Sequence, residues 1–481
     1  MLKNKVFKRH FPFVILSISI MFALTLPNLV QDGMFMDAVL YTSVSKNLSL
    51  GIGTFWFPKF SQFNVGNLPS FHEQPPLVFG IQSVFFNVFG TGMYVERFYT
   101  FLMMCITSVL IVVLWREIFR NNISIKQIFV LPLILWITIP VCFWSYSNNM
   151  HENTLGIFTL SAGIFLIKSF NSPQKLVFYS LLAGVFIFLA TLSKGVPGFF
   201  PLSIPFLYFI TTRKISLRIA VIQSFIIFII PIVFYFILFS FPESKESLSN
   251  YIFKRALFRI TEEPNESNRF FILQRLFWEL FPMLLFTCIA FSISKIKKLQ
   301  FIEFEQIKLS MFFISVGLSA SIPIMLTLIQ KGFYLVPSFP FFAVGFSILV
   351  SYLISDWIQK INIHSRLFLF VNVFSFALFI GVLVFAYLQM GKTSRDKELL
   401  HDIHLIGKYV PNKTLISVPD NVSWNNWQLQ TYLMRYYNIG LEVDSVNNYM
   451  IIENSEQKIG FPKYKKIEIG TFRFDLYECR E

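Results

Sequence analysis

The amino-acid sequence predicts an all-helical polytopic membrane protein that ends in a small α/β domain. Of its 481 residues, 54% are hydrophobic and 14% are charged, and the mean hydropathy is +0.59. A soluble domain carries about a quarter charged residues, so most of this surface must face lipid. Apolar runs of spanning length recur as far as residue 389, and charged residues return after Gly391.

The apolar runs predict about eleven transmembrane helices. The first, Phe11 to Leu29, follows a basic N-terminus, but it is long and has no small-residue cleavage site, which favours an uncleaved span over a signal peptide. The other predicted spans lie near residues 94–115, 127–144, 153–169, 175–192, 197–211, 218–240, 277–293, 309–329, 333–355 and 367–389.

The segment Pro75 to Phe89 is shorter and more polar, and the basic residues decide whether it crosses the membrane. If the N-terminus is cytoplasmic and this segment does not cross, every short basic loop falls on the inner side. If it did cross, every later loop would change sides. We therefore predict an amphipathic helix on the outer surface, which begins at its proline pair.

The C-terminal region has weaker apolar periodicity and alternating helical and strand-like patterns. We expect a transmembrane catalytic domain over residues 1–390 and an extracytoplasmic α/β domain over residues 391–481. In this second domain the patterns predict helices over 395–409 and 424–437 and strands over 414–418, 450–453 and 472–477.

Charge and cysteine usage give little support to nucleic-acid binding and indicate no cysteine-based site. The net charge of +14 could indicate nucleic-acid binding, but the basic residues form short clusters between apolar runs, which is how membrane proteins fix their orientation. The four cysteines show no spacing typical of a metal knuckle or a disulfide framework. We expect membrane lipids as partners and no nucleic acid.

The segment from Phe35 to Arg97 is the long external stretch richest in reactive side chains. Asp37 opens a helical run, and Tyr41 follows one turn later on the same face, so a carboxylate and a phenol lie side by side. The alternative is an Asp that only stabilises the start of a surface helix. Downstream, the same segment carries His72, Glu73 and Gln74 before the proline pair.

Further polar residues gather at the outer ends of the predicted spans. Glu152 follows His151 at a span start, where it could simply face the helix macrodipole. Lys194 and Lys331 each precede a glycine at a span end, and such lysines are often membrane anchors. The external loop 241–277 has an excess of positive charge that includes Arg255 and Arg259. Basic groups beside carboxylates at a lipid boundary suit a substrate with a phosphate on a lipid anchor.

A divalent-metal site is an alternative for four of these residues. Imidazole and carboxylate groups are ordinary metal ligands. The residues are His72, Glu73, His151 and Glu152. We favour a chemistry that needs no metal and no cofactor.

In this order the motifs resemble those of GT-C glycosyltransferases that use polyprenyl-phosphate sugars, namely the protein O-mannosyltransferases and the lipid A aminoarabinose transferases. The resemblance runs from the first span to about Pro340. It rests on Asp37, Tyr41, Gly51, Pro75, Pro76, Leu77, Phe89, Gly90, Arg97, Glu152, Lys194, Gly195, Lys331, Tyr334 and Pro337. The family resemblance implies the GT-C fold, with two juxtamembrane helices in the first external loop.

The resemblance also implies roles for individual residues. Asp37 would be the catalytic carboxylate and Glu152 the second acidic position, while Lys194 and Lys331 would lie near the carrier phosphate. The expected substrate-binding residues are Tyr41, His72, Glu73, Gln74, Arg97, His151, Lys194, Arg255, Arg259, Lys331 and Tyr334. Two positions depart from the pattern, because Ala38 replaces the second residue of an acidic pair and Gln74 replaces the lysine of the aminoarabinose enzymes.

We therefore expect a multi-pass inner-membrane glycosyltransferase that moves a sugar from a polyprenyl-phosphate donor to an acceptor on the periplasmic side, with inversion at the anomeric carbon. The acceptor would be lipid A, another glycan of the cell envelope or a protein. Two alternatives remain open: a transporter or flippase of lipid-linked sugars, and an enzyme of the same architecture that polymerises or ligates glycans.

Overall fold

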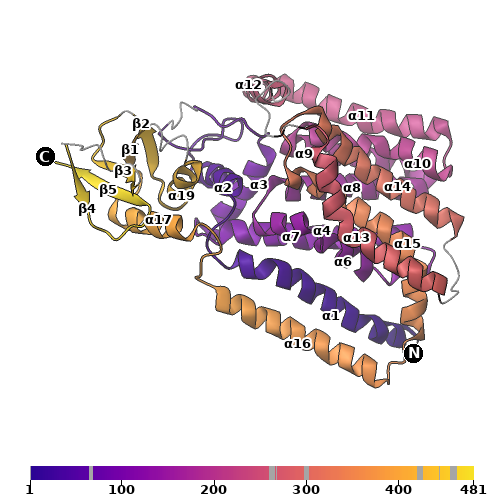
Figure 1. The fold of residues 1–481 in the computed structure, drawn as a ribbon. Helices are drawn as coiled ribbons and strands as arrows, with labels where there is room; N and C mark the ends of the chain where they lie inside the picture. The colour runs from indigo at the N-terminus through magenta and orange to yellow at the C-terminus, as the bar shows by residue number, and fades with distance from the viewer. Residues whose placement is uncertain are drawn as a thin grey trace. The chain divides into compact units, whose positions relative to one another are not determined.

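The computed structural model describes residues 2–63, 69–258, 266, 268–296, 303–419, 426–443, 445–454 and 463–480. The described chain is mainly helical with one small sheet, as predicted, and it forms two compact units (Figure 1). Unit 1 comprises Met1–Pro27, Thr100–Ser147 and His151–Leu388, and unit 2 comprises Asn28–Tyr99, Asn148–Met150 and Gln389–Glu481.

Unit 1 is a bundle of apolar helices. Its elements are α1 (Leu2–Leu29), α4 (Val95–Ile118), α5 (Ile123–Lys126), α6 (Val130–Ile137), α7 (Pro140–Ser147), α8 (His151–Asn171), η2 (Pro173–Lys175), α9 (Leu176–Lys194), η3 (Val196–Ser203), α10 (Ile204–Thr212), α11 (Leu217–Phe239), α12 (Pro242–Tyr251), η4 (Ile252–Ala256), α13 (Phe271–Ile296), α14 (Phe304–Ser321), η6 (Ile322–Leu326), η7 (Gly332–Ser338), α15 (Phe339–Lys360) and α16 (Arg366–Gln389). The predicted external loop 241–277 thus contains α12, the π-helix η4 and the start of α13.

Nine helices in the described part of the chain are long and apolar enough to cross a membrane. The pair α6 and α7 would make a tenth span, but it bends by 79°. The sequence predicted one unbroken helix here, and Pro140 explains the break because proline cannot continue a helix without losing a hydrogen bond. The remaining predicted span is the shorter apolar stretch Val196–Thr212.

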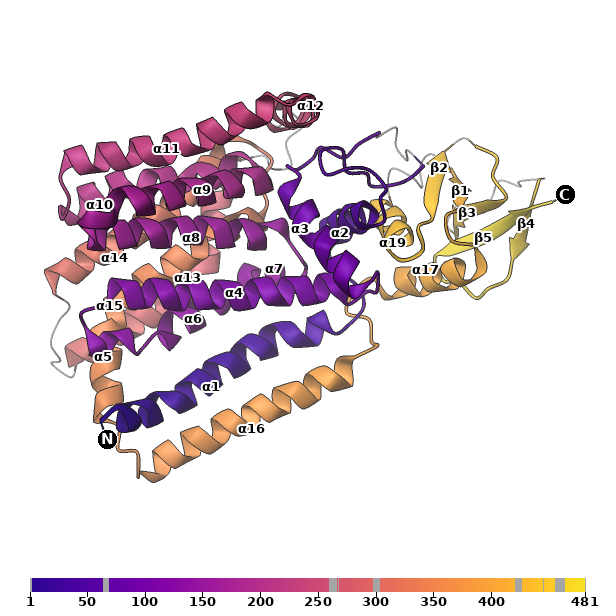
Figure 2. The same cartoon turned by 180° about the vertical axis from the view of Figure 1, so that it is seen from behind.

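The spans of unit 1 differ strongly in burial. In α8 and in the stretch Gly332–Lys360, 78% and 89% of the most apolar window is buried, against 17% in α11 and 11% in α16. The first two therefore form the centre of the bundle, and the last two present apolar side chains outward, as lipid contact requires. At the periphery α1 and α16 lie side by side (Figures 1 and 2), with the rings of Phe22 and Phe379 6.0 Å apart.

Unit 2 contains both predicted juxtamembrane helices, α2 (Met36–Ser49) and α3 (Leu77–Phe89). With 13 residues, α3 is about 20 Å long, which is too short to cross the hydrocarbon core unaided. This length agrees with the predicted surface position, which itself stays a prediction. Around Tyr41, a core of buried apolar side chains joins these helices to the C-terminal region, and it consists of Tyr41, Val44, Phe60, Phe71, Phe79 and Met434.

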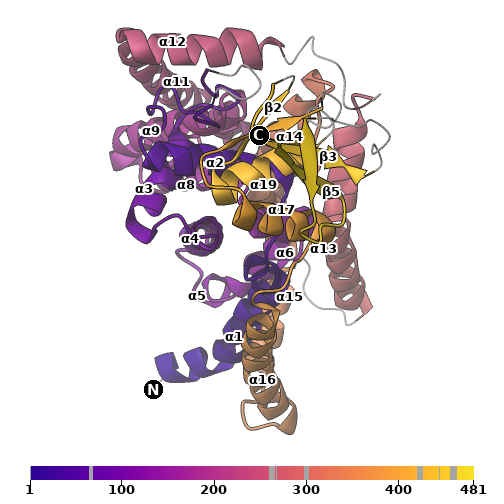
Figure 3. The same ribbon diagram turned by 90° about the vertical axis from the view of Figure 1, so that its left-hand side faces the viewer.

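The C-terminal part of unit 2 is a five-stranded sheet with two helices beside it (Figure 3). The helices α17 (Lys397–Tyr409) and α19 (Trp427–Tyr437) pack on each other. The strands are β1 (Leu415–Val418), β2 (Gly440–Val443), β3 (Tyr449–Glu453), β4 (Tyr464–Ile467) and β5 (Phe474–Cys479), in the order β2-β1-β3-β5-β4. The first three strands pair in parallel, and β5 pairs antiparallel to β3 and β4. The sequence predicted both helices and three of these strands but missed β2 and β4.

The chain enters and leaves unit 2 side by side. Asp32 N–H donates to the carbonyl of Lys392 at 2.8 Å, and Ser394 N–H donates to the carbonyl of Asp32 at 2.8 Å. These bonds tie the residues after α1 to the residues after α16. The domain boundary predicted at residue 390 stays a prediction.

Candidate active site

A buried ion pair between Glu152 and Lys194 is the centre of the candidate site in unit 1. The Lys194 ammonium donates to Glu152 Oε1, and the two side chains are 6% and 1% exposed. Ionised groups are costly to bury unless they are paired, so this contact holds both charges in place. The structure therefore brings together two residues that the sequence selected separately.

Local sequence explains where these two side chains lie. Glu152 is the second residue of α8, where its charge faces the positive end of the helix, and Lys194 is the last residue of α9. Gly195 ends α9 with a φ of +72°, and a Cβ there would lie 2.0 Å from the hydroxyl oxygen of Tyr251. That hydroxyl donates to the carbonyl of Lys194 at 3.2 Å. Only glycine fits this turn.

Aromatic rings cover the lysine. Lys194 Nζ lies 5.1 Å from the ring centroid of Tyr334 and 5.9 Å from that of Phe333, both within cation–π range. Phe333 in turn stacks on Trp144, with centroids 5.8 Å apart and an interplanar angle of 20°. A cation and its carboxylate are thus held under a wall of rings, where electrostatic interactions are stronger than in water.

The other predicted residues of unit 1 are placed as follows. His151 is fully buried at the start of α8, and Lys331 is exposed directly before η7, in which Tyr334 follows one turn later. Arg255 is half-buried in η4. Arg259 lies outside the described residues. Of these, Tyr334 contacts the Glu152–Lys194 pair, because its ring lies over the Lys194 ammonium.

In unit 2, Asp37 and Tyr41 lie one turn apart on α2, as predicted. Asp37 is half-buried in the first turn of the helix. The hydroxyl of buried Tyr41 accepts a hydrogen bond from Gln74 Nε2 at 3.4 Å, and its ring meets Phe71 and Phe79 edge-on, each at 6.1 Å. Gln74 therefore orients the phenol that shares a helix face with the predicted catalytic carboxylate.

His72 and Glu73 lie half-buried just before this glutamine. His72 Nε2 is 2.8 Å from the hydroxyl of Ser70, and its ring meets Phe57 edge-on. His72 is thus held by its own loop. In the described ranges no three His, Cys, Asp or Glu side chains lie close enough together to hold a metal ion.

A second cluster of buried charges in unit 2 surrounds Arg97. The two carboxylate oxygens of Glu96 accept from Arg435 Nη2 at 2.6 Å and Nε at 3.2 Å, and Arg435 Nη1 and Nη2 also donate to the carbonyls of Thr91 and Gly92. Arg97 Nε donates to the carbonyl of Gln31, its Nη1 is 3.3 Å from Glu96 Oε1, and its Nη2 is 3.7 Å from Asp32 Oδ1. Arg97, a predicted substrate-binding residue, is therefore part of this buried cluster.

The carboxylate of Asp32 is the other anchor of this cluster. It accepts from His404 Nε2–H at 2.7 Å, from the Tyr436 hydroxyl at 2.6 Å and from the backbone N–H of Gly33 at 2.7 Å. Burial raises the pKa of Asp32, but the hydrogen bonds from His404, Tyr436 and Gly33 outweigh it, so the pKa lies below its ordinary value. Burial raises the pKa of Tyr436 well above its ordinary value.

Lys46 is a buried amine at the edge of the same cluster. Its Nζ donates to the carbonyl of Arg435 at 2.7 Å and to Asn438 Oδ1 at 2.8 Å, at the C-terminal end of α19. Burial and the nearby Arg435 lower the pKa of Lys46 to about 7, although Glu96 acts in the opposite direction. Sequence reasoning missed Asp32, Lys46 and Arg435, because their partners lie far away along the chain.

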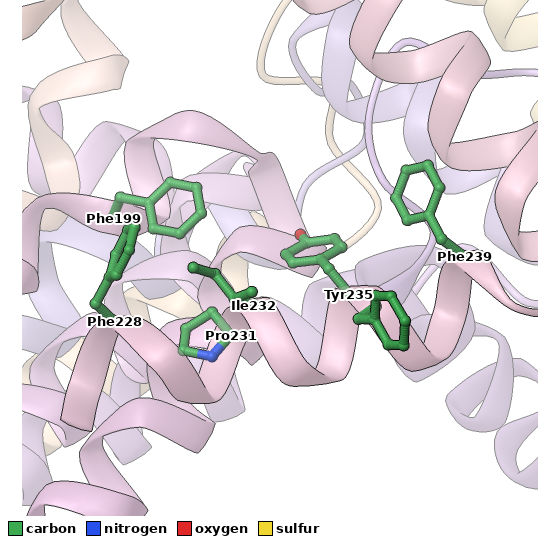
Figure 4. Close-up of a pocket in the computed structure, with 7 residues that line it drawn as sticks. Phe199, Phe228, Pro231, Ile232, Tyr235 and Phe239 are labelled. Atoms are coloured by element: carbon green, nitrogen blue, oxygen red, sulfur yellow. The ribbon is translucent and has the colours of Figure 1, made fainter. Parts of the chain in front are cut away.

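An apolar groove of about 350 Å³ runs along α11 in unit 1 (Figure 4). Its wall has one polar group, the hydroxyl of Tyr235, which donates to Thr191 Oγ1 at 3.0 Å. The groove contains no charged side chain and lies on a lipid-facing helix, so it suits hydrocarbon and not a sugar. It is lined by Phe199, Phe228, Pro231, Ile232, Tyr235, Phe236 and Phe239.

Sequence comparison finds a match to a family of glycosyltransferases. The profile of the dolichyl-phosphate-mannose-protein mannosyltransferases matches residues 73–239, a range that contains Glu152 and Lys194. No curated protein matches the chain significantly.

Solved structures match over a much larger part of the chain. The crystal structure of ArnT from Cupriavidus metallidurans bound to undecaprenyl phosphate has a TM-score of 0.63 at 11% identity and covers 96% of this chain and 97% of its own. The apo state of the same protein has a TM-score of 0.63 at 12% identity and covers 97% of this chain and 96% of its own. A third match is the archaeal oligosaccharyltransferase AglB from Archaeoglobus fulgidus in complex with an inhibitory peptide and a dolichol-phosphate. It has a TM-score of 0.55 at 13% identity and covers 90% of this chain and 65% of its own.

These findings confirm the resemblance expected from the sequence. At such low identity the structural matches show the fold alone, and the family profile adds sequence similarity over the part that carries the Glu152–Lys194 pair. Together they support a glycosyltransferase that is embedded in a membrane. The chain has the fold of ArnT and resembles the GT-C glycosyltransferases of the mannosyltransferase and aminoarabinose transferase type.

Proposed function

We propose that this protein transfers a sugar from a polyprenyl-phosphate donor to an acceptor at the extracytoplasmic face of the membrane, with inversion at the anomeric carbon. The observation that carries the proposal is the buried Glu152–Lys194 pair under the rings of η7. It supplies a fixed cation in a fold whose solved relative ArnT binds undecaprenyl phosphate.

The proposed chemistry gives each group a role. The phosphate leaves the anomeric carbon while an acceptor oxygen attacks from the opposite face. Lys194 stabilises the departing negative charge, and a preorganised cation of this kind often supplies the largest catalytic contribution. Asp37 accepts the proton of an acceptor hydroxyl, and Lys331 adds positive charge at the lipid boundary.

The uncharged side chain of Gln74 indicates which sugar the donor carries. In the aminoarabinose enzymes this position carries a lysine, whereas here Gln74 is buried and hydrogen-bonded to Tyr41. We propose a neutral hexose or pentose donor in preference to aminoarabinose. The acceptor is lipid A, another envelope glycan or a protein, and the inner membrane is the proposed location.

The test uses purified protein in proteoliposomes with a panel of polyprenyl-phosphate hexoses and pentoses. Mass spectrometry should detect free polyprenyl phosphate together with a glycosylated acceptor, and NMR of the product should show the inverted anomer. Donor that crosses the bilayer uncleaved would instead identify a transporter of lipid-linked sugars. Intact donor with every acceptor would contradict the proposal.

A second test addresses the face of the membrane. A periplasmic reporter fused after Gly391 should be active, whereas the same reporter fused after Arg120 should be silent. The reason is that the basic loops fix the orientation if α3 stays on the surface. Reversed activities would remove both the surface position of α3 and the proposed location of the site.

A further inference from the structure

The buried carboxylate of Glu279 lies inside the span α13 and is separate from the Glu152–Lys194 pair. It sits two turns into the helix and is 3% exposed. A charge within a membrane span is costly, and such residues are usually retained for a function. The contacts of this side chain show which segments it holds.

One oxygen of Glu279 stabilises the start of α7. Glu279 Oε2 accepts from the backbone N–H of Val141 at 2.9 Å. Pro140 begins α7 and has no N–H, so Val141 offers the first free donor of this helix. The carboxylate also faces the positive end of the helix dipole. Glu279 thus fixes α7 directly after the 79° break in the chain.

The other oxygen binds Arg275. Arg275 Nη2 is 2.7 Å from Glu279 Oε1, one turn away on α13. The guanidinium also lies against η7, because a Cβ on Gly332 would come within 3.1 Å of Arg275 Nε. The two residues therefore contact α7 on one side and the first residue of η7 on the other.

Gln330 adds hydrogen bonds to the junction of α7, α13 and η7 that Glu279 and Arg275 form. Its Oε1 accepts from Ile272 N–H at 2.8 Å in the first turn of α13, and its Nε2 donates to the carbonyls of Arg269 and Thr327. The chain just before η7 is thereby tied to the start of α13. Hydrogen bonds to backbone groups thus fix α7 through Glu279 and the chain before η7 through Gln330. They leave little freedom in the position of η7.

Both segments held in this way carry groups of the candidate site. Trp144 of α7 stacks on Phe333 of η7, and the rings of Phe333 and Tyr334 lie over Lys194. In α7, Ser145 Oγ donates to Asn153 Oδ1 at 2.7 Å, immediately after Glu152 in the chain.

From this chain of contacts we infer that Arg275 and Glu279 are positioning residues that set the distance between α7 and η7 and thereby hold the aromatic wall over Lys194. The inference rests on the proposed function. It predicts that loss of the Glu279 carboxylate moves Trp144 and Phe333 and lowers turnover, because a displacement of about 1 Å can reduce a rate about a hundredfold.

The experiment compares three variants in proteoliposomes. Glu279→Ala should lower kcat/KM by about tenfold to about a hundredfold, mainly through kcat, because Lys194 acts on the phosphate as it leaves. Glu279→Gln keeps an acceptor for Val141 N–H and should recover most of the loss. The matched control is Gln223→Ala, which removes the buried hydrogen bond from Gln223 to Ser169 Oγ. Ser169 lies 17 residues after Glu152 on α8, which places it about 25 Å from the candidate site. This control should leave kcat/KM unchanged.

A second readout does not depend on activity. Protein labelled with 5-fluorotryptophan gives a ¹⁹F resonance for Trp144, assigned by its loss in Trp144→Phe. This resonance should shift in Glu279→Ala, less in Glu279→Gln and not in Gln223→Ala.

Two results would overturn the inference: an unmoved Trp144 resonance in Glu279→Ala, or an active enzyme in which Glu279→Ala lowers kcat/KM no more than Gln223→Ala does. A wild-type protein that cleaves no donor would contradict the proposed function instead, and the resonance would still decide whether Glu279 positions α7.

Discussion

The buried charge clusters around Lys194 and around Arg435 are built differently. In unit 1, Lys194 meets one oxygen of Glu152, while the other oxygen is buried and has no hydrogen-bond partner in the described part of the chain. In unit 2, Arg435 meets both oxygens of Glu96 and two backbone carbonyls. The carboxylate of Glu152 thus has unused capacity to accept a hydrogen bond, whereas both oxygens of Glu96 are used, and the unsatisfied group that the described residues leave in the unit 2 cluster is Nη2 of Arg97.

This difference separates a candidate site from a structural clamp. A buried polar group without its full set of hydrogen bonds is costly and calls for an explanation, and a ligand that completes the set is one such explanation. A saturated network instead makes the fold more specific and rigid. We therefore expect substitutions in unit 1 to affect catalysis first and substitutions around Arg435 to affect stability first.

The largest effect should come from Asp37, which tests whether unit 2 also carries chemistry. Asp37→Asn should lower turnover about a hundredfold to ten-thousandfold if this carboxylate is a general base, because the amide cannot accept the proton. Donor cleavage in proteoliposomes measures the loss, and the exposed Asp356→Asn is the control. If the acceptor is a phosphate, it is already ionised at neutral pH and needs no base, so the pH–rate profile lacks the acidic limb that a carboxylate base gives. Turnover near that of the wild type on every acceptor would exclude Asp37 as the central residue.

The next effect should be on the stability of unit 2. Arg435→Met removes the closest cation of the buried Glu96 carboxylate and leaves only Arg97, at 3.3 Å, so we expect the protein to lose about 3–5 kcal/mol of unfolding free energy. Thermal and denaturant unfolding of the purified protein measure this loss. Lys360→Met, which breaks the exposed pair with Asp356, should cost less than about 1 kcal/mol. Equal costs for the two variants would show that the cluster is no clamp.

A smaller effect is expected for the lysine of unit 1. Lys194→Ala should weaken use of the lipid-phosphate donor by about 1.5–3 kcal/mol, the value of a charge-assisted hydrogen bond. The kcat/KM for the donor measures this effect. Lys331→Ala, at an exposed position, should act in the same direction, and Lys360→Met serves as a control for charge alone. Unchanged kinetics in both Lys194→Ala and Lys331→Ala would show that these lysines do not bind the phosphate and act as membrane anchors.

The smallest effect concerns the pH dependence of unit 2. The pKa of Lys46 is about 7 in the folded protein, against about 10.4 in an unfolded chain. Between these values the unfolded state binds the extra proton, so stability should rise with pH by at most about 1.4 kcal/mol per unit. Unfolding at pH 7 and at pH 9 measures the slope, and Lys46→Met should remove it. A slope that survives in this variant would assign the pH dependence to another group.

Sequence patterns were sufficient for much of the architecture. The spans, α2, α3 and the helices of the C-terminal domain follow from apolar periodicity and from prolines, which act over a few residues. The four-residue strands β2 and β4 were missed because each is an edge strand that exists through pairing with its neighbour. The break between α6 and α7 was missed because the apolar run continues through it.

For the candidate site, the sequence showed which residue types stand at the ends of the spans: Asp37, Glu152, Lys194 and Lys331 are acidic or basic groups in a largely apolar chain. Which of these groups contact each other became visible in the folded structure alone. Glu152 contacts Lys194 across 42 positions, and Glu96 contacts Arg435 across 339. A helix or a turn depends on neighbours within a few residues, whereas an ion pair between distant elements depends on how whole helices pack, and no local pattern encodes that packing.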